Sequence, residues 1–480
     1  MLSACLSLGA SIRSVAADVM PPAVSAALAR AGVPEDSVGL YVRDLTTGRE
    51  LLSIGADAAL NPASAMKLVT TFAALELLGP AYKWKTEAWL DGRLDGGRLS
   101  GNLALKGYGD PKLDLPSLWM FLRDLRRRGL REIDGDLLLD RSYFSIEPHD
   151  PAAFDNEPSR PYNTGADALL INSRALRLQF VPDEVRGTVA IHAEPELPQL
   201  MVVNGLRLAP GDCNDWPDEP SLREDVLEFS GTYPGGCGEK FRYFSELSAD
   251  DYAQSLFRQL WAQVGGEWNG RARPAELPAG ATLLATWESP PLADVVREIN
   301  KYSVNVMARQ LFLTLGARDG APATLEKSRA TVSGWLEHRG LAFPELAVEN
   351  GAGLSRTDRI SARHLGELLA AAYRSPLMPE FAASLSLAGV DGTLKKRLAA
   401  SPAAGRSHMK TGYLEGVRAL AGYSLDANMD VLAVVMIINH PQARAAQAAQ
   451  DALLEWANVQ GAAPDRSSEA PPRPRIVLVR

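Results

Sequence analysis

Three things are scarce or missing in this chain, and each absence excludes a class of protein. Only 3 of its 480 residues are cysteines, and none has the Cys or His neighbours that a zinc site needs. Positive charge is not in excess, since the formal net charge is -8, whereas nucleic-acid binding depends on clustered Lys and Arg. No stretch reaches the ~18 apolar residues of a membrane-spanning helix. The sequence therefore predicts neither a zinc protein nor a nucleic-acid-binding protein.

Histidine is also sparse. The six histidines are scattered, and none belongs to a His-Glu-x-x-His motif, which disfavours metallopeptidase chemistry. Spacing alone leaves a Ser-His-Asp triad open, because the order of triad residues varies between folds, but no pattern nominates one. No metal or cofactor is predicted. The basic run Arg126 to Arg128 follows an apolar segment and fits a solvated helix C-terminus better than an anion site.

What the chain contains is typical of a soluble globular protein. It is 46% hydrophobic and 22% charged, and its length suits two or three domains. Residues 1–17 are apolar and small and end Ser-Val-Ala-Ala, similar to a signal-peptidase site, although the basic start is missing and Arg13 interrupts the run. We interpret residues 1–20 as a signal remnant, with a disordered leader as the alternative, and residues 460–480 as a flexible tail.

Two segments far apart in the sequence both contain strand-like runs that suit a single sheet. Near each chain end, short strand-like runs are separated by turns, and Val431 to Ile438 is nearly all apolar, as a central strand would be. Because an isolated hairpin is only marginally stable, we expect one antiparallel sheet of about five strands, covered on one face by helices near 23–31 and 443–456. The predicted strands are Ser37 to Leu45, Glu50 to Ile54, Ser407 to Thr411, Val417 to Leu425 and Asp430 to Asn439.

Two kinds of sequence separate the halves of this sheet. Residues 289–385 carry apolar residues at helical spacing. Residues 82–284 are rich in strand-like runs and in Gly, Pro and Asp turns, with one helix near 118–126. The sequence therefore predicts an α/β catalytic domain formed by residues 21–81 and 285–459, carrying a β-rich insertion at 82–284.

The sharpest motif is Ser64-Ala65-Met66-Lys67, which opens a helix predicted to run to Leu78. Helical positions three apart share a face, so the hydroxyl and the amine can meet. A lysine can take the proton of a serine nucleophile if burial and nearby positive charge lower its pKa. Ser-x-x-Lys recurs at Ser407 to Lys410, but there we expect a strand, on which the two side chains point apart.

Lys410-Thr411-Gly412 ends a predicted strand and occurs once. An edge strand of this kind can pair with an extended peptide, while Lys410 and Thr411 meet its terminal carboxylate and Gly412 permits close approach. The N–H of Tyr413 is the expected second oxyanion donor, beside a donor at the start of the Ser64 helix. The alternative is a strand-end turn with a solvated lysine.

Ser303-Val304-Asn305 is the third element, at a helix entry in the helical block. In the functional interpretation, Ser303 relays a proton to the leaving amine, and Asn305 holds Lys67 and binds the substrate amide. The alternative is an ordinary serine helix cap, and Ser100-Gly101-Asn102 shows that the pattern arises easily.

The order of these motifs is typical of class A β-lactamases and penicillin-binding proteins. With a large insertion between the first two, the chain resembles the class C low-molecular-mass penicillin-binding proteins, the D-Ala-D-Ala carboxypeptidase/endopeptidase family, over about residues 21–457. The resemblance implies a β-lactamase/transpeptidase-like domain with two smaller inserted domains. Further matching segments are Leu105 to Pro111, Gly135 to Leu137, Gly351 to Arg356 and Asp391 to Leu394.

The resemblance also implies a substrate. Ser64 is the acylated nucleophile and Lys67 its base, acting on peptidoglycan peptides, with β-lactams as inhibitors. In the family an arginine, here Arg356, and an acid-plus-aromatic pair bind the diaminopimelate end of the stem peptide. Asp155 and Tyr162 are the counterparts of that pair. Glu415 stands where relatives often have Gln and puts a carboxylate near the substrate's amino group.

Two alternative functions and one cysteine pairing are weighed on the sequence. A serine β-lactamase shares the motifs, but the large insertion and the lack of a Glu-x-x-x-Asn element disfavour it. A non-catalytic β-lactam-sensing or wall-binding protein is opposed by the intact Ser64 and Lys67. Cys213 and Cys237 could form a disulfide, which needs an oxidising compartment; we expect a periplasmic or secreted protein. Peripheral contact with a membrane, oligomeric state and the balance of carboxypeptidase and endopeptidase activity are not determined.

Overall fold

The computed structural model describes residues 19–197, 199–213, 221–223, 226–245 and 247–461. Cys5, most of the predicted signal remnant and nearly all of the predicted tail lie outside these residues. No helix in the described part of the chain is long and apolar enough to cross a membrane.

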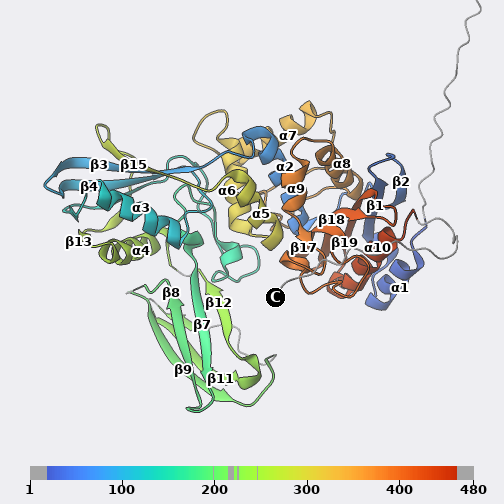
Figure 1. Ribbon diagram of the computed structural model, residues 1–480, viewed down its shortest axis with the longest axis horizontal. Coiled ribbons are helices and arrows are strands. Elements are labelled where there is room, and N and C mark those ends of the chain that lie inside the picture. The colour runs from blue at the N-terminus through green and yellow to red at the C-terminus, as the bar shows by residue number, and fades with distance from the viewer. Residues whose placement is uncertain (1–18, 198, 214–220, 224–225, 246, 462–480) are drawn as a thin grey trace, which may run out of the picture.

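One sheet joins the two ends of the chain, as predicted (Figure 1). Its order is β16-β17-β18-β19-β1-β2, and every neighbouring pair is antiparallel. The sheet has six strands rather than about five, because the two residues of β16 are too few to show alternation in the sequence. The strands are β1 (Val38–Asp44), β2 (Glu50–Ile54), β16 (Ser386–Leu387), β17 (Ser407–Leu414), β18 (Val417–Leu425) and β19 (Val431–Asn439).

Helices cover both faces of this sheet because β19 is apolar on both. Val434 and Met436 pack with the terminal helices α1 and α10, whereas Val435 and Ile437 pack with the helical block, as the two-residue period of a strand requires. The helices are α1 (Pro22–Ala31), α2 (Lys67–Leu78), α5 (Leu292–Tyr302), α6 (Asn305–Gly316), α7 (Leu325–His338), α8 (Ala362–Tyr373), α9 (Met378–Ala383) and α10 (Gln447–Asn458).

The insertion contains two further sheets, one beside the helical block and one in a separate lobe (Figure 1). The first holds β3 (Lys85–Asp95), β4 (Arg98–Gly107), β5 (Glu132–Ile133), β6 (Leu137–Asp140), β13 (Glu267–Trp268), β14 (Ala272–Pro274) and β15 (Thr282–Glu288). The lobe holds β7 (Leu176–Asp183), β8 (Thr188–Glu194), β9 (Met201–Ala209), β10 (Ser221–Arg223), β11 (Val226–Pro234) and β12 (Lys240–Phe244).

The insertion has one more helix than predicted. Besides α3 (Leu115–Arg127), at the expected place, α4 (Ala249–Gln263) packs its buried side chains into the same apolar core. Its first turn contains Asp250 and Asp251, and the sequence predicts Asp-rich stretches of the insertion as turns. The domain boundaries at 81/82 and 284/285 stay predictions.

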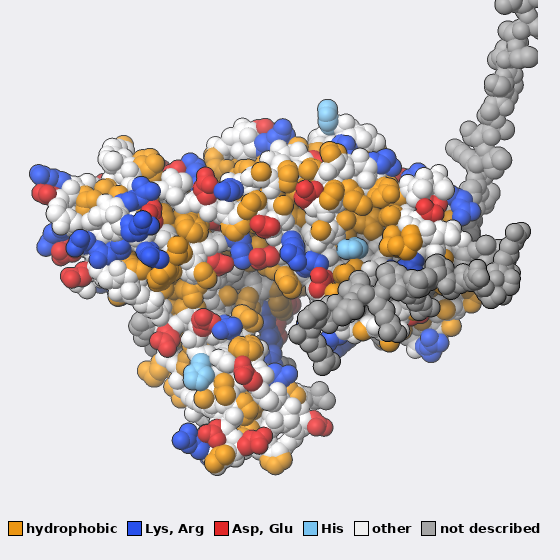
Figure 2. All heavy atoms as spheres, viewed as in Figure 1, with side chains coloured by type: hydrophobic (Ala, Val, Ile, Leu, Met, Phe, Trp, Pro, Cys, Tyr) orange, Lys and Arg blue, Asp and Glu red, His pale blue; other side chains and the backbone are white. Residues whose placement is uncertain are grey.

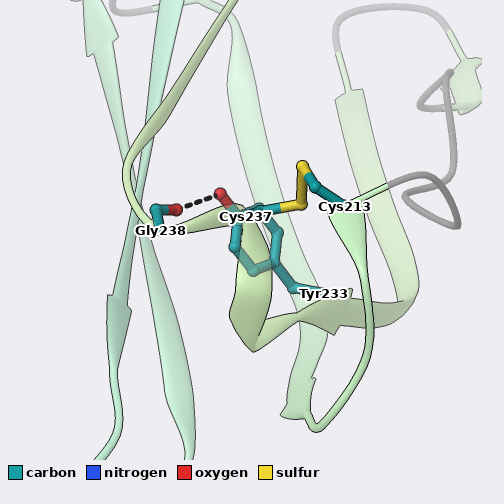
Figure 3. Close-up of a disulfide and its surroundings, with 4 residues drawn as sticks. All are labelled: Cys213, Tyr233, Cys237 and Gly238. Carbon is teal, nitrogen blue, oxygen red and sulfur yellow. Dashed lines mark hydrogen bonds between the residues drawn. A yellow bond between two sulfur atoms is a disulfide. The ribbon is translucent and has the colours of Figure 1, made fainter.

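Cys213 and Cys237 form a disulfide in the lobe, next to a hydrogen bond from the Tyr233 hydroxyl to the carbonyl of Gly238 at 2.6 Å (Figure 3). The bridge ties the end of the β9 segment to the turn after β11. The sequence had left this pairing open.

Basic side chains gather over α3 and the β3–β4 hairpin, interspersed with acidic ones (Figure 2). Arg128, at the end of α3, pairs with Asp124 at 2.7 Å. Arg126 donates to the carbonyl of Leu130 at 2.9 Å. The arginine run therefore lies at the C-terminal end of a helix, as predicted.

Candidate active site

Ser64 lies in a short 3-10 turn, η2 (Ala63–Met66), immediately before α2. The α-helix itself begins at Lys67, three residues later than predicted. The two residues nevertheless face each other, since a 3-10 turn also eclipses positions three apart. Ser64 Oγ and Lys67 Nζ are 2.9 Å apart.

Lys67 is fully buried and held by three oxygen atoms. Besides Ser64 Oγ, its amine contacts Asn305 Oδ1 at 2.6 Å and the carbonyl of Ala352. Burial, followed by the positive charges of Lys410 and Arg309, holds the pKa of Lys67 well below its usual value. This combination of desolvation and like charge favours the neutral amine that a general base requires.

A second lysine–hydroxyl pair stands beside the first. Ser303 joins α5 to α6 in the left-handed region, at φ 60°, and its hydroxyl accepts from Lys410 Nζ at 2.9 Å. Lys410 has no exposed surface, and burial lowers its pKa to about 7. The alternatives of a solvated lysine and of a serine helix cap are therefore both wrong. Lys410 is not solvated, and the residue at the N-cap of α6 is Val304 rather than Ser303.

Two glycines allow the chain to close tightly around Ser64. A Cβ on Gly412 would lie 2.4 Å from the carbonyl oxygen of Pro62, and one on Gly353 would lie 2.0 Å from that of Ala63. Strand β17 and the loop after α7 thus both press against the turn that carries Ser64. Tyr413, next on β17, is 49% exposed, and the hydroxyl of Thr411 donates to Thr393 Oγ1 at 2.8 Å.

A loop of the insertion forms another wall. The hydroxyl of Tyr162 donates to Asp155 Oδ2 at 2.9 Å, so the acid and the aromatic residue nominated by resemblance are in contact. The carbonyl of Tyr162 accepts from Asn305 Nδ2 at 3.4 Å. Asn305 therefore spans from Lys67 to the insertion.

Arg356 faces this wall from the loop after α7. Its guanidinium lies 4.6 Å from the ring of Phe154 and donates to the carbonyl of Glu415 at 3.1 Å. The carboxylate of Glu415 is 3.8 Å away and its side chain is 93% exposed. The structure thus brings Arg356 and Glu415 together, but the ring against Arg356 belongs to Phe154 rather than Tyr162.

Several residues of the site were missed in the sequence. Asn61 donates to the carbonyl of Ser355 and accepts from the N–H of Ala63. Arg309, one turn after Asn305, is buried, donates to the carbonyl of Thr164 at 2.5 Å and has a pKa lowered by burial to about 10. A charge inside an apolar helical run was the signal that could have identified Arg309.

In the second Ser-x-x-Lys copy, the serine and lysine side chains have different partners, as expected for a strand. Ser407 Oγ lies 2.8 Å from Ser424 Oγ in the interior, whereas Lys410 contacts Ser303. In the described part of the chain no group of His, Cys, Asp and Glu could hold a metal ion. The arrangement pairs one serine with a base and another with a cation, which suits acyl transfer.

Comparisons with known proteins agree with this geometry. A model of the D-Ala-D-Ala carboxypeptidase 3 (S13) family matches residues 21–460. The D-alanyl-D-alanine carboxypeptidase DacB of Haemophilus influenzae is 26% identical over 85% of this chain and 86% of its own length. A D-alanyl-D-alanine carboxypeptidase of an Actinomadura strain is 28% identical over 86% of this chain and 80% of its own.

Comparison with solved structures finds a protein of the same kind. The crystal structure of penicillin binding protein 4 of H. influenzae superposes with a TM-score of 0.74 at 24% identity, covering 91% of this chain and all of that one. The fold class and family predicted from the sequence are confirmed. The chain belongs to the D-Ala-D-Ala carboxypeptidase 3 (S13) family and is a serine-type carboxypeptidase of the low-molecular-mass penicillin-binding proteins.

Proposed function

We propose that Ser64 is the nucleophile of a D-alanyl-D-alanine carboxypeptidase that also cleaves cross-linked stem peptides of peptidoglycan. One observation carries the assignment: Ser64 and Lys67 converge with Ser303 and Lys410 although these pairs come from distant parts of the chain. Nothing in the geometry favours a second function.

The first step is acylation. Neutral Lys67 donates its two N–H groups to Asn305 and Ala352 and turns its lone pair to Ser64, whose proton it accepts. Ser64 Oγ attacks the carbonyl carbon of the penultimate D-alanine, and the oxyanion is held by the N–H groups of Ser64 and Tyr413. The C–N bond then breaks.

The leaving group must be protonated and the acyl group released. Ser303 relays to the departing amine the proton that Lys67 took from Ser64, so that Ser303 keeps its hydroxyl, which Lys410 supports at 2.9 Å. Lys410 and Thr411 hold the carboxylate of the leaving residue, an ion pair strengthened by the burial of Lys410. Lys67, neutral again, takes a proton from a water molecule whose oxygen attacks the ester carbonyl carbon. The C–O bond to Ser64 breaks, and that proton returns to Ser64 Oγ.

The stem peptide's side chain lies toward the insertion in this proposal. Arg356 binds its carboxylate, and Asp155 with Tyr162 binds its amino group. Glu415, largely exposed beside Arg356, adds a second carboxylate for that amino group. The Phe154 ring stacks against Arg356 and limits its rotamers.

Penicillins acylate Ser64 in the same proposal. Penicillin binding protein 4 of H. influenzae has been crystallised in complex with a β-lactam. We further propose a periplasmic or secreted location, because the Cys213–Cys237 disulfide suits an oxidising compartment.

Product analysis tests the function. Purified protein is incubated with cross-linked and uncross-linked muropeptides and, separately, with a labelled penicillin. We expect D-alanine release, cleavage of cross-links and a stable label. Rapid loss of the label would indicate a β-lactamase, and a stable label without peptide cleavage would indicate a sensor.

A further inference from the structure

A small pocket lies behind strand β17, next to the candidate active site. It has a volume of about 270 Å³, and its walls come from β17, β18, α10 and the segment after η7 (Gly392–Leu394). Its lining includes Thr411, Arg397, Arg418 and Gln450. None of the catalytic steps above uses the last three of these residues.

Positive charge is in excess around this pocket. Arg397 pairs with Asp451 at 2.6 Å, but within the described residues no carboxylate lies within 4.0 Å of the Arg418 guanidinium. Arg418 donates to the carbonyl of Arg444 at 3.3 Å and lies 4.7 Å from the Tyr413 ring. Burial, then the charge of Arg397, lowers the pKa of Arg418. Within the described residues, Asp451 is thus the ion-pair partner of Arg397, and Arg418 has none.

Two buried donors in its lining lack an acceptor. Arg418 Nε and Gln450 Nε2 have no hydrogen-bond partner, and Gln450 is only 1% exposed. Arg397 donates to Gln450 Oε1 at 3.4 Å, which fixes the orientation of the amide. An unsatisfied buried donor costs about 1–3 kcal/mol, so an acceptor is expected here. Two donors and a free positive charge select an anion.

The pocket adjoins the carboxylate end of the substrate. Thr411 belongs both to the pocket and to the Lys410-Thr411-Gly412 strand. A released D-alanine has one carboxylate. A peptide strand released from a cross-link has that carboxylate and others farther along the strand.

We propose that this pocket binds a second carboxylate of the strand released from a cross-link, with Arg418 and Gln450 as its donors. The inference rests on the proposed function and assigns Arg418 and Gln450 to the choice between cross-linked and uncross-linked peptides.

The test measures binding in a Ser64→Ala background, where no cleavage occurs. Dissociation constants are determined by calorimetry for a cross-linked muropeptide dimer and for an uncross-linked pentapeptide. We expect Arg418→Gln to lower the ratio of the two affinities about tenfold, as the loss of a charge-assisted hydrogen bond predicts. Gln450→Leu should lower the ratio by a smaller factor, because it removes an uncharged donor.

Arg444→Gln is the matched control, since it removes an exposed charge beside the pocket but no lining group. The ratio should stay within twofold of the parent. An unchanged ratio in Arg418→Gln, or an equal fall in Arg444→Gln, would overturn the proposal.

The other candidate ligand for this pocket is a free anion, such as inorganic phosphate, which offers the same negatively charged oxygen atoms. Inorganic phosphate should weaken dimer binding in the parent and have less effect in Arg418→Gln. Phosphate binding that depends on Arg418 while the peptide ratio does not change would mean a free-anion site and would overturn the proposal. Penicillin labelling of the unsubstituted protein is measured separately, so that failure of the nucleophile assignment is distinguishable from failure of the pocket.

Discussion

The insertion and the active site both bury charge, but in opposite ways. In the insertion, two buried acids have basic partners: Asp140 contacts Lys106 at 2.8 Å and Glu87 contacts Lys85 at 2.6 Å. Burial opposes ionisation of each acid, but hydrogen bonds, including those from these lysines, outweigh it and lower both pKa values. In the active site the base Lys67 has no ion-pair partner among the described residues, and burial, followed by the charges of Lys410 and Arg309, lowers its pKa.

The difference separates a structural use of buried charge from a chemical one. An acid paired with a base keeps both groups ionised and stabilises one conformation. A base among bases is held in its neutral, reactive form at an energetic cost that the surrounding packing must offset. Asp358, with no exposed surface, is the one carboxylate that opposes this effect on Lys67, and burial raises its own pKa to about 6.

The largest effect is expected at Ser64. Ser64→Ala should abolish penicillin labelling and peptide cleavage, because the attacking oxygen is gone, and should leave the circular dichroism spectrum unchanged. Ser407→Ala, in the second Ser-x-x-Lys copy, is the control and should retain labelling. Labelling of the Ser64→Ala protein would refute the nucleophile assignment.

Replacing Lys67 of the active site and Lys106 of the insertion tests the comparison directly. Lys67→Met should slow acylation by several orders of magnitude, since base and nucleophile act as a unit, and stopped-flow penicillin acylation measures it. Lys106→Met should leave acylation within a few-fold but destabilise the protein by about 3 kcal/mol in urea unfolding, because Asp140 loses its partner. A near-normal acylation rate in Lys67→Met would remove this residue from the mechanism.

The pH dependence sharpens the same point. Activity needs neutral Lys67, so kcat/KM should fall as pH drops through the pKa of Lys67. It also needs charged Lys410, whose pKa is about 7, so kcat/KM should fall as pH rises above that value. In Lys410→Arg the charge persists, and the alkaline limb should move upward whatever the absolute rate. An alkaline limb that remains near 7 would exclude Lys410 as its origin.

The smallest effect on activity is expected from the lobe. Cys213→Ala with Cys237→Ala removes a bridge across a sequence separation of 24, which should lower stability by about 3 kcal/mol through the entropy of the unfolded chain. Denaturant unfolding measures this loss, and acylation should be unaffected. A matching fall in acylation would show that the lobe supports the active site.

Much of this arrangement could be predicted from local sequence. The limits of β18, the apolar strand β19 and the joining of the chain ends all follow from periodicity, because burial on a strand repeats every 2 residues and on a helix every 3.6. Helix α4 and strand β16 were not predicted. The start of α4 is acidic, and the two residues of β16 are too few to show a period.

The residues of the active site likewise fall into those that the sequence could identify and those that it could not. Ser64, Lys67 and Lys410 stand in motifs whose spacing already predicts a chemistry. Phe154, Ala352 and Arg309 carry no such pattern, since their contacts with Arg356, Lys67 and Thr164 join segments far apart in the chain.

The sequence by itself determined the sheet, the helical block and the three motifs, because short-range spacing decides which side chains share a face. Only the tertiary structure decided that the amines of Lys67 and Lys410 are both buried, that Asn305 reaches the insertion, and that a pocket with unpaired donors lies behind Thr411. Desolvation and charge depend on every neighbour in space, and those neighbours are assembled only when the chain has folded.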